Sequence, residues 1–138
     1  MMPERARLRD FAKRFTAAWC SQNASSVAAC FAPNGSLSVN GAPAVGRRAI
    51  TEVAQGFMTA FPDMQLLMDD LLMQGHRAVY HWTFIGTNTG PGGTAHRVRI
   101  SGFEVWQIGE DGLIVESQGH FDSAAYQRQL ERGVEESP

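Results

Sequence analysis

The sequence predicts an α+β domain in which a long, curved antiparallel sheet wraps around three helices. Two observations support this class. Helical spacing of apolar residues is concentrated in the first 61 residues, and most strand-like alternation follows it. Helices followed by a meander of strands are typical of α+β folds rather than of parallel α/β folds. Because a long sheet twists, its concave face needs a cover, and the three helices would form a cone with an internal pocket.

Three helices are predicted in the first half. Residues 3–21 carry an apolar stripe with helical spacing. The stripe consists of Leu8, Phe11, Ala12, Phe15, Ala18 and Trp19. A shorter helix follows Asn23 as cap, and its apolar face consists of Val27, Cys30 and Phe31. A third helix is predicted over residues 46–61, where Pro62 ends the helical pattern.

The second half reads as strands with turns between them. The predicted strands are 64–73, 77–86, 96–108 and 112–122, after a short edge strand at 36–39. Ser123 is expected to cap a last helix that runs to about residue 131. The acidic tail, 133–138, is expected to fray. The whole chain, 1–138, is therefore predicted to be one domain with a core over about 8–131.

Composition excludes several classes of function. The chain has 138 residues and a net charge of −2, and no basic cluster exceeds the pair Arg47–Arg48, so a nucleic-acid partner is not expected. No apolar stretch approaches the ~20 residues of a membrane span, so a soluble, cytoplasmic protein is expected. Cys20 and Cys30 are interpreted as reduced core thiols. The histidine spacing predicts no metal site, and the glycines of 86–93 form a loop rather than a phosphate cradle, so no cofactor is expected.

The last predicted strand carries polar groups on one face. Side chains in a strand repeat every two residues, so one face holds Glu116, Gln118, His120 and Asp122. This face is either exposed to water in the ordinary way or lines a cavity in which a carboxylate and an imidazole act. His120 and Asp122 would lie about 7 Å apart along the strand, close enough to reach one substrate.

A candidate pocket follows from the aromatic residues. If they do not all interlock, they line an apolar cavity together with Gln118; the set is Phe15, Trp19, Phe57, Phe61, Trp82 and Phe103. In the strand 77–86, Tyr80, Trp82 and Phe84 make the better inward set, which places His81 outside.

Several segments together carry a resemblance to a known family. They are Phe61-Pro62-Asp63, His81-Trp82-Thr83 leading into Gly86-Thr87-Asn88-Thr89-Gly90, and Glu110 to Glu116 with a terminal Asp122. In order and spacing the chain resembles the SnoaL-like branch of the nuclear transport factor 2-like superfamily, which includes polyketide cyclases and ketosteroid isomerases. The resemblance implies that Asp122 matches the aspartate that drives ring closure by an intramolecular aldol step.

Two readings of Asp122 remain open. A carboxylate at the closed end of an apolar pocket has its pKa raised towards the working range of a general base. Alternatively, Asp122 caps the final helix, or it pairs with Arg99, which falls opposite it if Glu110 and Asp111 form a two-residue loop. A single bulge would remove that pairing.

The sequence thus favours a cofactor-free acid/base enzyme of the aldol cyclase or isomerase type that binds a small hydrophobic, oxygenated molecule. The alternative is a non-catalytic ligand-binding or dimerisation module on the same fold. A homodimer through the outer sheet face is also expected, because apolar groups such as Phe121 and Ile85 would otherwise be exposed. The competing reading is that outer apolar groups are scattered and diluted by Arg97, Arg99, Gln107 and Ser117.

Overall fold

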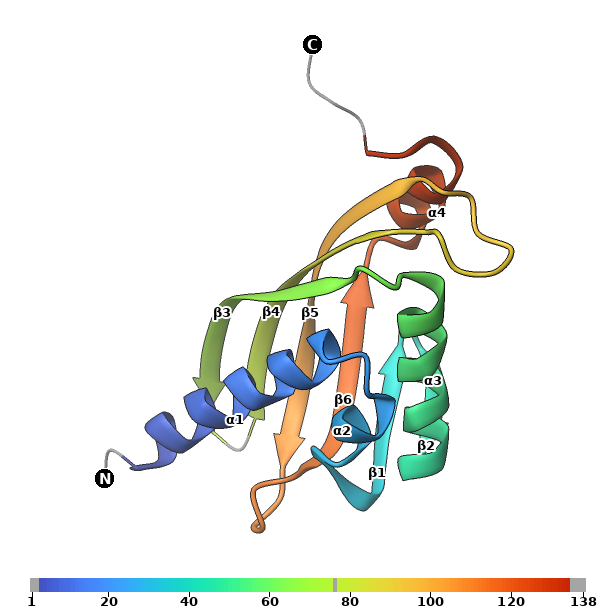
Figure 1. Ribbon diagram of the computed structural model, residues 1–138. Helices are drawn as coiled ribbons and strands as arrows, with labels where there is room; N and C mark the ends of the chain where they lie inside the picture. The colour runs from blue at the N-terminus through green and yellow to red at the C-terminus, as the bar shows by residue number, and fades with distance from the viewer. Residues whose placement is uncertain (1–2, 76, 135–138) are drawn as a thin grey trace.

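The computed structural model describes residues 3–75 and 77–134, which form four helices and a six-stranded sheet (Figure 1). In chain order the elements are α1 (Pro3–Cys20), α2 (Ala24–Ala28), β1 (Phe31–Val39), β2 (Ala42–Val45), α3 (Arg47–Ala60), β3 (Gln65–Gln74), β4 (Arg77–Thr87), β5 (Arg97–Ile108), β6 (Ile114–Phe121) and α4 (Ser123–Arg132). The predicted α+β class is confirmed. The end of the predicted frayed tail, 135–138, lies outside the described residues.

The six strands form one mixed sheet in the order β2-β1-β6-β5-β4-β3. Every neighbouring pair is antiparallel except β1 and β6, which run parallel. The prediction of an antiparallel sheet is therefore corrected at this one pair. The reason lies in the chain path: β1 adds beside the last strand of the meander, with which it shares a direction, and not beside β3.

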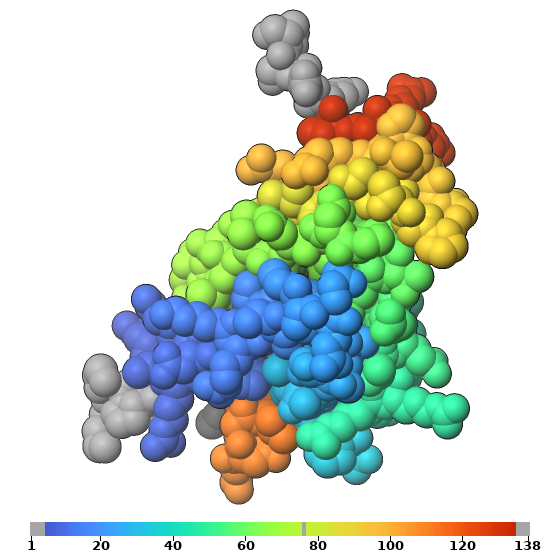
Figure 2. Space-filling view, viewed as in Figure 1, coloured from blue at the N-terminus to red at the C-terminus, as the bar shows by residue number. Residues whose placement is uncertain are grey.

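Three helices cover one face of this sheet. Figure 2 shows α1 and α2 in blue and α3 in green across the front of the molecule, where they hide the middle of the sheet. The apolar stripes make the contact, because Phe15 of α1 and Ile50 of α3 are fully buried. α4 lies apart from these helices, at the end of the sheet where the C-terminal segment leaves it (Figure 1). No helix among residues 3–75 and 77–134 is long and apolar enough to cross a membrane.

The segment after α2 differs from its prediction. The predicted second helix included Phe31 on its apolar face, whereas α2 ends at Ala28 and Phe31 opens β1. Gly35 allows this strand, because a Cβ there would lie 2.9 Å from the Ile114 carbonyl oxygen of the neighbouring strand. Arg47 fixes the start of β1 by donating two hydrogen bonds to the Phe31 carbonyl, at 3.0 and 2.8 Å. Strand β2 was not predicted.

The two cysteines are free thiols, as expected, but they are not both in the core. Cys20 is exposed at the end of α1, and Cys30 is half-buried. Cys20 still contributes to packing, because its Sγ accepts a hydrogen bond from the Leu66 amide at 3.3 Å. The helical stripe ended one residue before Cys20, which explains why its exposure was misjudged.

The sheet has an inner face under the helices and an outer face away from them. On β4, Tyr80, Trp82 and Phe84 are buried on the inner face, and His81 lies on the outer face; both predictions are confirmed. Register carries this division across the sheet. Tyr80 pairs with Glu104, and Glu104 pairs with Gly119, so these three residues form one inner row. Trp82, Gly102 and Phe121 form the next inner row.

Candidate functional site

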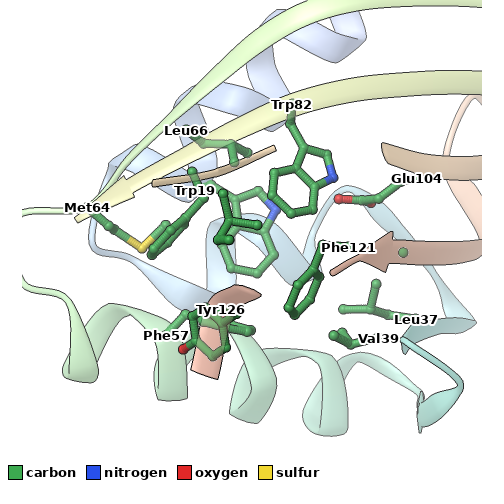
Figure 3. A pocket seen from close by; sticks show the side chains of 13 residues that line it. Trp19, Leu37, Val39, Phe57, Met64, Leu66, Trp82, Glu104, Phe121 and Tyr126 are labelled. Atoms are coloured by element: carbon green, nitrogen blue, oxygen red, sulfur yellow. The ribbon is translucent and has the colours of Figure 1, made fainter. Parts of the chain in front are cut away.

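An apolar cavity of about 70 Å³ lies between the inner face and the helices (Figure 3). Every strand except β2 reaches it or its edge, and the helices contribute aromatic rings. Its lining consists of Trp19, Leu37, Val39, Phe57, Met64, Leu66, Trp82, Phe84, Ile100, Glu104, Gly119, Phe121 and Tyr126. Four of these residues, Val39, Phe57, Phe121 and Tyr126, are only half-buried, so they mark the mouth. The volume is sufficient for several water molecules or a compact organic group.

Glu104 is the ionisable acid of this cavity. It is buried on β5, and its Oε1 accepts two hydrogen bonds, from Trp106 Nε1 at 3.0 Å and from Ser117 Oγ at 2.7 Å. Trp106 and Ser117 are themselves cross-strand partners, one residue pair further along the inner face. Both bonds reach the same oxygen, so Oε2 has no hydrogen-bond partner among the described residues. The carboxyl group is thus held by one oxygen and free at the other.

The surroundings change the acidity of Glu104. Burial raises the pKa of Glu104 above that of an ordinary glutamate, because removal from water penalises the carboxylate. The hydrogen bonds from Trp106 and Ser117 favour the ionised form and oppose this rise. A carboxyl group whose pKa is raised can hold or release a proton closer to neutral pH, which is the requirement for a general acid or base.

Two glycines make room for the polar groups of the site. A Cβ on Gly102 would lie 2.7 Å from the Trp82 ring and 2.4 Å from the His120 carbonyl oxygen, so only glycine lets the indole approach β5 this closely. Gly119 stands opposite Glu104, and a Cβ there would lie 3.2 Å from the Ser38 carbonyl oxygen and 3.6 Å from Glu104 Cγ. The missing side chains leave space beside the carboxyl group.

Two indole N–H groups of the lining have no hydrogen-bond partner among the residues that the structure describes. They are Nε1 of Trp19, on α1, and Nε1 of Trp82, on β4, and both atoms are buried. Figure 3 shows both nitrogens inside the ring of lining side chains, with the nitrogen of Trp82 on the side that faces Glu104. A buried donor without a partner carries a desolvation cost of about 1–3 kcal/mol, so the pair is an unusual feature of an otherwise apolar wall.

Only part of the predicted site lies at the cavity. Trp19, Phe57 and Trp82 line it. Phe15 and Phe61 are fully buried in the core, where Phe15 packs edge-on against Trp106 at 4.8 Å and Phe61 against Phe84 at 4.9 Å.

The remaining predicted residues lie elsewhere, which corrects their expected placement. Gln118, His120 and the predicted pocket residue Phe103 are exposed on the outer face, where the rings of His120 and Phe103 lie tilted to each other with centroids 5.0 Å apart. Asp122 is exposed and caps α4, accepting a hydrogen bond from the Ala125 amide at 3.0 Å. Asp122, and not Ser123, is therefore the cap of this helix.

Register explains the difference. Gly102 pairs with Phe121 and Gln107 with Glu116, and a bulge follows at Gln107/Ile108. This pairing turns Ser117, Gly119 and Phe121 inwards and their polar neighbours outwards. It also moves the paired part of β6 two residues along β5 from the register of a two-residue loop, so Arg99 does not stand opposite Asp122.

Glu104 is not among the site residues predicted from the sequence, although the pattern of β5 contains a signal for it. From residue 98 to residue 106, the even-numbered residues of β5 are Val98, Ile100, Gly102, Glu104 and Trp106, an inward series in which one acid interrupts apolar and small residues. A lone carboxylate in such a series indicates a buried functional group. Among residues 3–75 and 77–134, no three His, Cys, Asp or Glu side chains gather in a way that could hold a metal ion.

Comparisons with known proteins agree with this architecture. The model of the SnoaL-like domain family matches residues 12–117. No match was found among curated proteins. Many solved structures share the fold. One, from Jannaschia sp. CCS1, is assigned as a SnoaL-like polyketide cyclase; it superposes with a TM-score of 0.80 at 12% identity, covering 94% of each chain.

Two further structures were determined with small molecules. A protein of ketosteroid isomerase-like fold from Catenulispora acidiphila, in complex with trimethylamine, has a TM-score of 0.78 at 15% identity and covers 93% of this chain and 97% of its own. TerC, co-crystallised with polyporic acid, has a TM-score of 0.74 at 16% identity and covers 91% of this chain and 98% of its own. The fold is thus the nuclear transport factor 2-like fold, and the chain belongs to the SnoaL-like domain family.

Proposed function

We propose that the protein binds a small hydrophobic, oxygenated molecule in the cavity and moves a proton at a carbon next to a carbonyl group, with Glu104 as the acid/base. The observation that carries this proposal is a buried carboxyl group at the wall of an apolar cavity, with one oxygen held by Trp106 and Ser117 and the other without a partner. Such a group is costly to bury and is typical of functional sites.

The family and fold support a reaction of this type. Aldol cyclisation and ketone isomerisation both begin when a base removes a proton beside a carbonyl group. Glu104 would take that proton in its ionised form and return it to oxygen or carbon in its protonated form. The small molecules bound by the related structures support a cavity that holds organic ligands.

The test is proton exchange. Cyclic ketones that raise the melting temperature are incubated with the protein in deuterated buffer, and deuterium uptake beside the carbonyl is followed by NMR. Glu104→Gln keeps the acceptor for Trp106 and Ser117 and removes the base, so exchange should fall by about 10²–10⁴-fold. Glu116→Gln is the matched control, because it makes the same change at an exposed carboxylate on β6. It should leave exchange unchanged. Equal exchange by the wild type and Glu104→Gln would contradict the proposal.

Asp122 is the alternative acid/base, as the family resemblance implies. The same exchange assay on Asp122→Asn decides between the two carboxyl groups. Loss of exchange in Asp122→Asn, with retention in Glu104→Gln, would assign the reaction to Asp122. Retained binding without exchange in the wild type would favour the ligand-binding module.

We also propose that the protein forms a homodimer through the outer sheet face. Apolar side chains are exposed there on two strands: Phe103 on β5 is 37% exposed and Leu67 on β3 is 43% exposed. Phe121, which was expected on this face, lies on the inner face against Trp82, with ring centroids 6.0 Å apart, so Phe103 takes its place in the interface.

A further inference from the structure

The wall of the cavity contains two hydrogen-bond donors that the protein itself does not use. Trp19 and Trp82 are each 8% exposed, and their Nε1 atoms are buried without a partner among residues 3–75 and 77–134. The third indole in the chain, Trp106, differs from both, because its Nε1 donates to Glu104 at 3.0 Å and its ring is fully buried. The two indoles that line the cavity are therefore the ones whose N–H groups have no partner.

The rest of the lining does not satisfy these donors, because neither Nε1 atom has a hydrogen-bond partner among residues 3–75 and 77–134. Apart from Glu104 and Tyr126, its side chains are apolar. Neither oxygen-bearing group accepts from them: Glu104 Oε1 accepts from Trp106 and Ser117, Glu104 Oε2 accepts from no described residue, and Tyr126 lies at the mouth on α4. A ligand that brings acceptor oxygens would relieve two unpaired donors at once, which is a strong basis for selecting one polar pattern over another.

We propose that the two indoles recognise the ligand by donating hydrogen bonds to its oxygens. Trp82 donates to the carbonyl oxygen, and Trp19 donates to a second acceptor oxygen of the same compact ring. This inference rests on the proposed function, because it places the carbonyl beside Glu104, on the side of the cavity to which the Trp82 nitrogen points (Figure 3). The substrate class is then a small cyclic ketone with an ether, hydroxyl or second carbonyl oxygen away from the first.

Size restricts this class. The cavity is about 70 Å³, whereas an engineered cavity that admits benzene measures about 150 Å³. A single ring therefore occupies the cavity only with movement of the half-buried side chains at the mouth, such as Phe57 and Phe121. A fused multi-ring skeleton does not fit. Both donors belong to side chains that line this one cavity.

The experiment uses three rings of matched size. Methylenecyclohexane has no acceptor oxygen, cyclohexanone has one, and tetrahydropyran-4-one has two. The intact protein is labelled with ¹⁵N, and its three indole N–H signals are assigned with Trp19→Phe and Trp82→Phe. We expect methylenecyclohexane to cause only small changes in the chemical shifts of the Trp19 and Trp82 indole N–H signals. Cyclohexanone should shift the Trp82 signal, and tetrahydropyran-4-one should shift the signals of both Trp82 and Trp19. Trp106 should move less than either and serves as the internal control.

Affinity gives the second readout. Trp82→Phe keeps an aromatic ring but removes the N–H, so it should weaken cyclohexanone binding roughly tenfold more than it weakens methylenecyclohexane binding. Equal loss for both compounds would mean that the indole acts by packing and would overturn the proposal. So would failure of all three rings to bind at millimolar concentration, or shifts confined to Trp106. Binding is measured without turnover, so the two proposals can fail separately. If Glu104→Gln loses exchange and keeps the indole shifts, both proposals are supported. If Glu104→Gln keeps exchange and shows the expected indole shifts, only the catalytic proposal is overturned.

Discussion

The inner and outer faces of the sheet carry similar kinds of residue in different surroundings. On the inner face, the row of Trp82, Gly102 and Phe121 follows the row of Tyr80, Glu104 and Gly119. Between them, on the outer face, lies a third row, in which His81 and His120 flank Phe103 with centroid distances of 5.8 and 5.0 Å.

Both faces thus combine aromatic rings with titratable groups. On the inner face the titratable group is enclosed, and burial raises the pKa of Glu104. On the outer face His120 is exposed to water. Enclosure, rather than the number of polar residues, distinguishes a candidate catalytic face from a surface.

The largest expected difference between the faces is in stability, and two aromatic residues of β5 measure it. Trp106 is fully buried and stacks on Tyr80 at 4.7 Å, whereas Phe103 is 37% exposed. Trp106→Ala should reduce the free energy of unfolding by about 3–5 kcal/mol, and Phe103→Ala by about 1 kcal/mol or less. Urea denaturation of the two variants at low protein concentration measures both values. Equal losses would mean that the outer face is also part of a packed core.

The next prediction concerns pH. Because the folded state raises the pKa of Glu104, it holds a proton that the unfolded chain releases at lower pH. This contribution is fully present below the ordinary glutamate pKa and is lost as pH rises through the raised value. Glu104→Gln is neutral throughout, so its unfolding midpoint should exceed that of the wild type increasingly from acid to neutral pH.

The control for this prediction is Glu116→Gln on the outer side of β6, which should show no such divergence. If the unfolding midpoints of Glu104→Gln and the wild type were equal at every pH, the buried carboxyl group would not destabilise the folded state. Activity and stability would then not be opposed at this site.

The outer face can be tested through assembly. Phe103→Lys places a charge in the centre of the row between His81 and His120 and should convert a dimer to a monomer. Sedimentation at micromolar concentration measures this against Leu113→Lys, a change on the turn before β6 that leaves the row intact. A wild-type species of 15.1 kDa would exclude the dimer.

The smallest effect is expected at Asp122. Alanine removes the acceptor for the Ala125 amide and should cost about 1 kcal/mol, whereas asparagine caps nearly as well and should cost only a few tenths. Thermal unfolding of both variants gives this ratio. Equal costs for asparagine and alanine would show that the charge of Asp122, and not its capping bond, matters to the fold.

The sequence was sufficient for the fold and for the inward set of β4, because long apolar patterns and turn residues dictate them. It was insufficient for β6. Ser117 and Gly119 are small, so the inward face of β6 lacks the run of large apolar residues that marks a buried face. The polar pattern of the outward face is the stronger signal in the sequence. Their smallness serves Glu104, which needs a hydroxyl donor and open space. The residues that build the site therefore weakened the signal that would have located it.

The same reasoning applies to the bulge near Ile108. No local residue pattern distinguishes a two-residue loop at 110–111 from the longer turn that the chain adopts, in which the Gly109 amide donates to the Leu113 carbonyl at 2.9 Å. Pairing of β6 with β1 on its other side also constrains the register, and that contact is distant in sequence. Long-range pairing of this kind cannot be deduced from local spacing.

The position of α4 has a consequence for the rate at which ligands exchange. α4 supplies Tyr126 to the mouth, yet none of its residues is fully buried. Within the described part of the chain, one hydrogen bond through a side chain ties it to the sheet, from the Arg99 amide to Gln129 Oε1 at 2.6 Å. Elements with so little buried surface open locally at a small fraction of the global unfolding free energy. Entry and release should therefore follow the detachment of this terminal helix, and amide hydrogen exchange in α4 should report the same opening rate as ligand dissociation.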